Sequence, residues 1–165
     1  MSTNPMATVV SCDGFELPAS LAAVNKCITL GTMLDLLDEE QTVGIPIPVP
    51  GVDGETLTKV IEWCEYRSNA PIPDLQKDAE TKLSTWDIPK WDGDFLESVN
   101  DDMLFKITRA ANYLEIPLLL RYATRRIAMI LGPMSIEEMR EFLNIESDWT
   151  PEQEARLREG SFWAF

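Results

Sequence analysis

Apolar and polar positions alternate with a period of two near the N-terminus and with helical spacing over most of the remaining chain. Residues 7–12 form a short run that contains the β-branched Thr8, Val9 and Val10, and the strand pattern resumes at residues 15–17 after an Asp-Gly turn. Residues 45–50 alternate Ile and Val with Pro. Because Pro lacks an N–H, the last of these segments predicts an edge strand whose Ile and Val side chains face the core. Pro18 is expected to end the second strand.

Helical spacing predicts several short amphipathic helices with recognisable starts. The predicted first residues or caps are Ser20, Asp53, Asn100 and Pro117. After the second cap, the apolar residues Leu57, Val60, Ile61 and Cys64 form one face. Phe95 and Leu96 are expected to open a short helix, and residues 67–82 are polar and aperiodic, which predicts a flexible loop.

The charge balance narrows the classes of partner. The 165 residues include 28 Asp and Glu against 14 Lys and Arg, so the formal net charge is −14. Such a surface repels phosphate groups, which disfavours nucleic acid and anionic membrane as partners. Arg121, Arg125 and Arg126 form the one basic cluster, and a solvated or salt-bridging helix face explains it better than nucleic-acid binding. No run of about 20 apolar residues is present, and the N-terminus does not resemble a signal peptide.

Residues suited to catalysis are scarce. The chain has no His, which removes Ser-His-Asp and Cys-His catalysis and the usual general base near neutral pH. Cys12, Cys27 and Cys64 have no CxxC spacing, and Cys64 is expected in the core. We therefore expect a protein that is not an enzyme, with no cofactor, metal or small-molecule substrate. The three scattered cysteines fit reduced thiols in the cytoplasm and nucleus.

The segment 132–165 is rich in large apolar side chains although its predicted helices are short. Capping boxes at Ser135–Glu138 and Thr150–Gln153 predict two helices that are too short to be stable alone. The chain then closes with Phe-Trp-Ala-Phe at 162–165. Packing against the body of the chain and docking to a partner both remain open, and the enrichment in Trp, Phe and Met favours a partner.

Several strings of residues, taken in order, resemble the Skp family of adaptor proteins. They are IPVPGV at 47–52, LTKVIEWC at 57–64, WDGDFL at 91–96, LF at 104–105 with AANYLEI at 110–116, and EEMR at 137–140, NI at 144–145 and WAF at 163–165. Each string alone is weakly specific, but the ordered set covers nearly the whole chain.

The resemblance implies a two-part adaptor. Residues 1–131 would form a BTB/POZ-like α/β (α+β) domain, a small sheet flanked by helices, that binds a cullin scaffold. Residues 132–165 would form a C-terminal helical extension that binds F-box proteins. The chain would then link cullin to F-box substrate receptors in an SCF-type E3 ubiquitin ligase and catalyse nothing itself.

The same resemblance assigns site residues. Asn112, Tyr113 and Phe105 would face the cullin, although Tyr113 could instead be a partly buried core residue. The residues that would contact the F-box are Met139, Leu143, Ile145, Trp149, Trp163 and Phe165.

Other functions are weighed against this adaptor role. A structural subunit of an F-box-containing assembly without ligase activity would use the same family features, and the sequence does not separate the two. An elongin-C-like adaptor shares the BTB-like core, but such chains lack the helices predicted after Gly132. An enzyme is disfavoured because nucleophiles and bases are missing.

Overall fold

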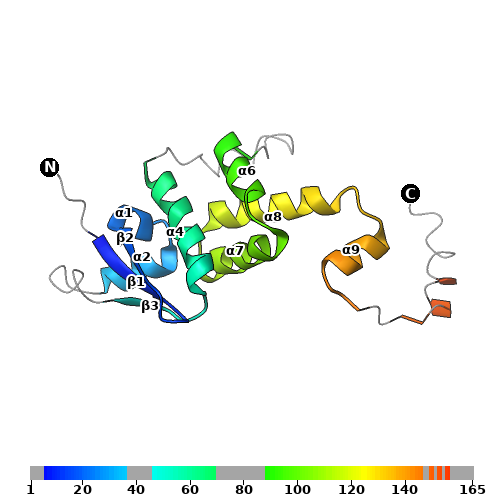
Figure 1. Ribbon diagram of the computed structural model, residues 1–165, viewed down its shortest axis with the longest axis horizontal. Coiled ribbons are helices and arrows are strands. Elements are labelled where there is room, and N and C mark those ends of the chain that lie inside the picture. Colours follow the sequence, from blue (N-terminus) through cyan, green and yellow to red (C-terminus); the bar gives the residue numbers. More distant parts are fainter. Residues whose placement is uncertain are drawn as a thin grey trace. The chain divides into compact units, whose positions relative to one another are not determined.

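The computed structural model describes residues 6–36, 46–69, 88–146, 149–150, 152–153 and 155–156. The elements in these ranges (Figure 1) are β1 (Met6–Ser11), β2 (Glu16–Ser20), α1 (Leu21–Val24), α2 (Ile28–Asp35), β3 (Ile47–Val49), α4 (Gly54–Ser68), α6 (Lys90–Glu97), α7 (Asp101–Tyr113), α8 (Pro117–Leu131) and α9 (Ile136–Phe142). The chain divides into two compact units, residues 1–127 and 128–165, and the division falls within α8. The functions predicted for residues 1–131 and 132–165 stay predictions.

The three strands form one small mixed sheet in the order β2-β1-β3. Strand β1 pairs antiparallel with β2 and parallel with β3. Ile47 and Val49 of β3 are buried while Pro48 is exposed, which confirms the predicted edge strand. The prediction that Pro18 ends the second strand is wrong, because β2 continues to Ser20. As β2 lies at the other edge of the sheet, the missing N–H of Pro18 is not needed by a further strand.

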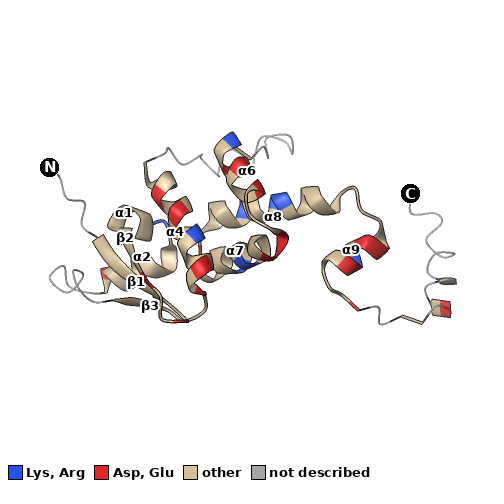
Figure 2. Cartoon of the chain, viewed as in Figure 1, with Lys and Arg blue, Asp and Glu red and all other residues tan. Residues whose placement is uncertain are grey.

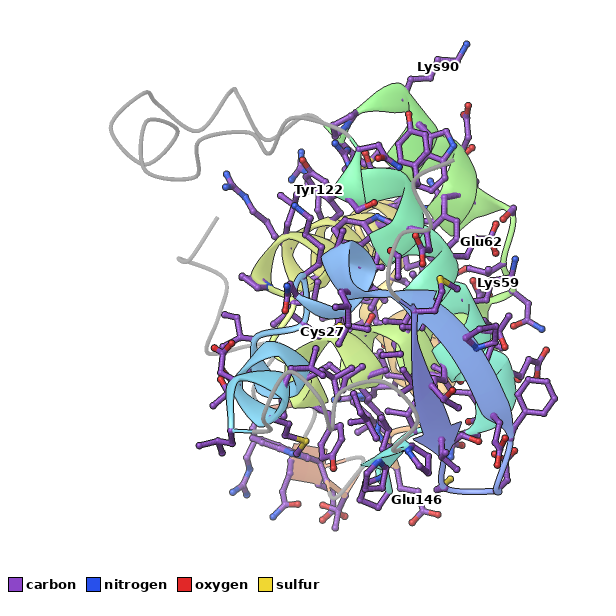
Figure 3. All side chains as sticks on the ribbon, turned by 90° about the vertical axis from the view of Figure 1, so that its left-hand side faces the viewer. Cys27, Lys59, Glu62, Lys90, Tyr122 and Glu146 are labelled. Atoms are coloured by element: carbon purple, nitrogen blue, oxygen red, sulfur yellow. The ribbon has the colours of Figure 1, made fainter. Side chains whose placement is uncertain are left out.

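Helix α4 is the centre of the first unit, where it contacts α1, α7 and the strands β1 and β2 (Figure 1). It begins as predicted, because the Asp53 side chain accepts a hydrogen bond from the Thr56 N–H at 3.0 Å. The predicted apolar face is buried, including Cys64. The Cys64 Sγ lies 3.9 Å from the Sγ of Cys27, which Figure 3 shows in the interior near α1 and α4.

Two boundary predictions near the end of α4 are wrong. Arg67 is predicted to begin a loop but lies buried in the last turn of α4, and residues 70–82 of that predicted loop fall outside the described residues. Phe95 and Leu96 are predicted to open a helix but lie near the end of α6. The buried Arg67 needs a counter-charge, and Asp92 in the first turn of α6 supplies it. Helix α6 begins at Lys90, directly after Pro89, so the buried Phe95 and Leu96 fall in its last turn.

Helices α7 and α8 complete the core of the first unit. The Asn100 side chain caps α7 by accepting from the Met103 N–H at 2.8 Å. The apolar residues Leu104, Ile107 and Ala111 form the inner side of α7 and are buried. The helix ends at Tyr113, two residues before Glu115, whose φ of 53° is left-handed and stops the helix. Helix α8 begins at Pro117 as predicted.

The described part of the second unit contains α9 and a second cap. Ser135 and Glu138 form a complete capping box at the start of α9. Thr150 and Gln153 exchange the same pair of hydrogen bonds, at 2.8 and 3.3 Å. Both predicted boxes are therefore confirmed, yet no residue of α9 is buried.

Candidate functional site

The predicted cullin-binding residues lie on one outward stripe of α7. Phe105 and Asn112 are two helical turns apart, and Tyr113 adjoins Asn112. Phe105 is half-buried, whereas Asn112 and Tyr113 are exposed. Arg109 is also exposed and lies between them, one turn from each end of the stripe. We call Phe105, Arg109, Asn112 and Tyr113 the α7 face.

The Tyr113 ring packs on the turn that follows β3. A Cβ placed on Gly51 would stand 2.9 Å from Tyr113 Cζ, so glycine is the residue that lets the ring lie this close. The tyrosine nevertheless keeps 44% of its surface exposed. Its carbonyl accepts a hydrogen bond from Thr29 Oγ1 at 3.4 Å, which ties the end of α7 to α2. One side of Tyr113 therefore supports the fold while the other stays accessible.

Two depressions border the α7 face. The larger, about 600 Å³, is open to solvent and is lined by α4, by the loop before α7 and by Phe105 of the α7 face. The smaller, about 200 Å³, lies between the β3–α4 turn and α7, and Arg109 lines it together with Gly51 and Asp53. Lys106 contributes to both depressions. A partner that covers α7 can therefore insert side chains on either side of it.

Of the two cations that line the smaller depression, Lys106 has a described carboxylate close to it and Arg109 has none. The hydrogen bond from the Thr56 backbone N–H, the Thr56 hydroxyl and the nearby Lys106 hold the pKa of Asp53 below its ordinary value, so this carboxylate is ionised at neutral pH. Asp53 Oδ2 lies 3.5 Å from Lys106 Nζ. Arg109 forms no ion pair with any described residue. Neither Lys106 nor Arg109 is among the predicted site residues. Arg109 follows Phe105 by four residues and precedes Asn112 by three, and this helical spacing is a signal that points to it.

Four of the six predicted F-box-binding residues are described. Met139 in α9 is half-buried, while Leu143, Ile145 and Trp149 are exposed. Trp163 and Phe165 lie outside the described residues. The exposed apolar side chains Ile136, Leu143, Ile145 and Trp149, which we call the C-terminal patch, are between 36% and 64% exposed. Exposed apolar side chains grouped in this part of the sequence are typical of surfaces that a partner covers.

A buried ion pair joins α4 to α6. Asp92 is fully buried and accepts hydrogen bonds from Trp63 Nε1 at 2.9 Å, from Arg67 Nε at 3.1 Å and from Arg67 Nη2. The guanidinium also lies about 6 Å from the rings of Trp63, Tyr66 and Tyr122. None of these residues lines either depression. The pair therefore stabilises the scaffold that carries the α7 face.

The described ranges offer neither a metal site nor a membrane-spanning helix. They contain no group of three or more Cys, Asp or Glu placed to hold a metal ion. Among the helices described, none has the length and apolar character needed to cross a membrane. Within the arginine cluster of α8, Arg126 forms an ion pair with Glu97 at 2.9 Å, which agrees with the predicted salt-bridging role.

Comparisons with known proteins match both units. The family described as "Skp1 family, tetramerisation domain" matches residues 5–69, and that described as "Skp1 family, dimerisation domain" matches residues 117–164. The "E3 ubiquitin ligase complex SCF subunit sconC" of Arthroderma benhamiae is 38% identical over 99% of this chain and 96% of its own. Proteins of the same name from Aspergillus flavus and Aspergillus terreus are 38% and 37% identical, over 98% and 99% of this chain and 97% and 99% of theirs. The predicted BTB/POZ-like α/β fold is confirmed.

Proposed function

The chain belongs to the Skp1 family, and from that membership we propose that it is a non-catalytic adaptor of an SCF-type E3 ubiquitin ligase. In this role it binds a cullin scaffold and an F-box protein and brings them together. The transfer of ubiquitin is carried out by other subunits of such a complex.

The observation that carries this proposal is the C-terminal patch. A short helix such as α9, with no buried residue, gains little stability by itself. Ile136 in α9 and the exposed residues Leu143, Ile145 and Trp149 after it leave water when a second polypeptide covers them, and we assign that role to the F-box. Interfaces of this obligate kind commonly bury about 2,000 Å² or more and are more apolar than average.

The α7 face supplies the second contact that an adaptor needs. It lies in the first unit, whereas the C-terminal patch lies in the second. Tyr113 is 44% exposed, and tyrosine is enriched in the centre of protein interfaces, while the exposed amide of Asn112 can donate and accept hydrogen bonds. We assign this face to the cullin and the C-terminal patch to the F-box.

Two substitutions test the cullin surface. Asn112→Lys combined with Tyr113→Lys should abolish binding to a cullin N-terminal domain and spare F-box binding, both measured by surface plasmon resonance. Thr124→Lys, on an exposed position of α8, is the matched control and should change neither affinity. Loss of both partners, or of neither, would refute the assignment of two separate surfaces.

The F-box surface is tested in the same assay. Trp163→Ala and Trp149→Ala should each weaken F-box binding by roughly 2–4 kcal/mol if the side chain is a buried anchor. Ile28→Ala removes an apolar residue of the first unit that is 52% exposed, close to the 47% of Trp149, and should have little effect on F-box binding. Capture of an F-box protein without any cullin would instead favour a structural subunit of a non-ligase assembly.

We also propose that the chain works in the cytoplasm and nucleus. Its three cysteines are free thiols, two of them buried, and such thiols persist in reducing compartments. Imaging of a fluorescently tagged chain tests this placement, and a signal confined to the secretory pathway would contradict it.

A further inference from the structure

We propose that Arg109 selects the cullin by pairing with one of its acidic side chains, which enters the depression of about 200 Å³ beside α7. This inference rests on the proposed function, because it assigns a chemistry to the same surface. It gives Arg109 a specific role within the α7 face, whose predicted cullin contacts are Phe105, Asn112 and Tyr113.

The position of Arg109 places it inside the α7 face. It follows Phe105 by four residues and precedes Tyr113 by four, so all three project from one side of the helix. A partner that contacts both Phe105 and Tyr113 must therefore pass over Arg109. The guanidinium is covered in the complex even though it is exposed in the free chain.

The local charges leave Arg109 as the group that needs a partner. Lys106 is the other cation at this depression, and the ionised Asp53 lies 3.5 Å from its ammonium. No described carboxylate forms such an ion pair with Arg109. A guanidinium that is covered without an opposite charge loses its hydration and gains nothing in exchange, which makes an apolar occupant unfavourable. A carboxylate restores the balance and matches the planar fork of donors on Arg.

The depression has the size and the walls for such a side chain. Water occupies roughly 30 Å³ per molecule, so a space of about 200 Å³ admits the few non-hydrogen atoms of an Asp or Glu side chain. Gly51 forms one wall, and the Tyr113 ring packs closely against it. Val52 and Ala110, both buried, form other parts of the lining, so the site is shaped before a partner arrives.

Arg109 is a cation on a chain whose net charge is strongly negative. The chain carries 28 acidic residues against 14 basic ones, so most of its surface repels acidic partners. Figure 2 shows Lys and Arg positions in blue along α7. A cullin surface with a carboxylate opposite Arg109 is thus attracted at this face, and one with a Lys or Arg there is rejected.

Binding kinetics of charge variants test the inference. Arg109→Glu and Arg109→Met are compared with Arg125→Glu and Arg125→Met, which make the same changes on an exposed position of α8. The full chain binds an immobilised cullin N-terminal domain, and association and dissociation rates are recorded at several salt concentrations. We expect Arg109→Glu to weaken binding by at least about tenfold, mainly through faster dissociation, because a covered charge pair acts on dissociation. The Arg125 variants should stay within about twofold of the unchanged chain.

A second arm identifies the acidic group. Exposed Asp and Glu residues of the cullin domain are changed to Lys one at a time, and at least one change should restore binding of Arg109→Glu. If none restores it, or if Arg109→Glu binds as the unchanged chain does, the inference fails while the adaptor role stands. If the unchanged chain binds no cullin at all, the proposed function itself fails. F-box binding, measured in parallel, shows that each variant is folded.

Discussion

Replacement of Asp92 by Asn tests whether the buried ion pair holds α6 against α4. Asp92 has 0% of its surface exposed and Arg67 has 7%, so water replaces few of the contacts that are lost. The carboxylate accepts from Trp63 Nε1 and from two nitrogens of Arg67. Asn has nearly the same volume but offers one carbonyl oxygen and no charge. The change therefore leaves a buried guanidinium without its counter-charge and at least one donor without an acceptor.

The size of the effect follows from these contacts. Breaking a buried ion pair from one side costs about 3–5 kcal/mol, whereas one unsatisfied buried donor costs about 1–3 kcal/mol. An Asn amide oxygen in the place of Oδ1 still accepts from Trp63 Nε1 and Arg67 Nε, so that only Arg67 Nη2 loses its acceptor. The three aromatic rings about 6 Å from the guanidinium also still attract its charge. We therefore expect the free energy of unfolding to fall by about 3 kcal/mol, the lower end of the range for ion pairs. A typical domain has about 5–15 kcal/mol in total, so the variant should fold but be clearly weakened.

Urea unfolding followed by circular dichroism measures this difference. The control is Glu62→Gln, which breaks an exposed pair on α4 where Glu62 Oε2 lies 2.9 Å from Lys59 Nζ. Figure 3 shows both of these side chains on the outer side of the helix. Such a pair is worth about 0.5 kcal/mol or less. If Asp92→Asn costs no more than Glu62→Gln, the reasoning about burial and counter-charge is wrong.

The remaining predictions concern titration and reactivity. Hydrogen bonds from the Ser11 hydroxyl and the Gly54 N–H hold the pKa of Asp13 below its ordinary value of 3.8. The stability that they provide is therefore present above about pH 4 and lost as pH falls through the lower folded pKa. Asp13→Asn should flatten that part of an acid-unfolding curve, and an unchanged curve would contradict it. The Cys27 thiol and burial raise the pKa of Cys64, so iodoacetamide should label Cys12 quickly and the buried pair only on unfolding. Mass spectrometry counts the alkylated thiols, and three rapid additions to the folded chain would be the contrary result.

Local signals predicted much of the framework of the site. The caps at Asp53, Asn100 and Ser135 depend on residues three positions apart, so a reader of the sequence can find them. The stripe of buried residues on α7 likewise leaves Phe105, Asn112 and Tyr113 on its other side. The ion pair of Arg67 with Asp92 was not predictable in this way, because 25 residues separate its members. The polar neighbours of Arg67 therefore predict a loop, whereas its side chain is buried against Asp92 and the residue lies in the last turn of α4.

The amino-acid order by itself determined the periodic faces of the helices, the absence of histidine chemistry and the concentration of large apolar residues after Gly132. These properties depend on composition and on spacings within one or two helical turns. Only the tertiary structure decided that Tyr113 packs on Gly51, that Asp53 lies 3.5 Å from Lys106 and that Arg109 lines a depression without an ion pair to any residue that the structure describes. Each of these depends on segments more than 50 residues apart that meet when α4 packs between the sheet and α7, and no local pattern records such a meeting.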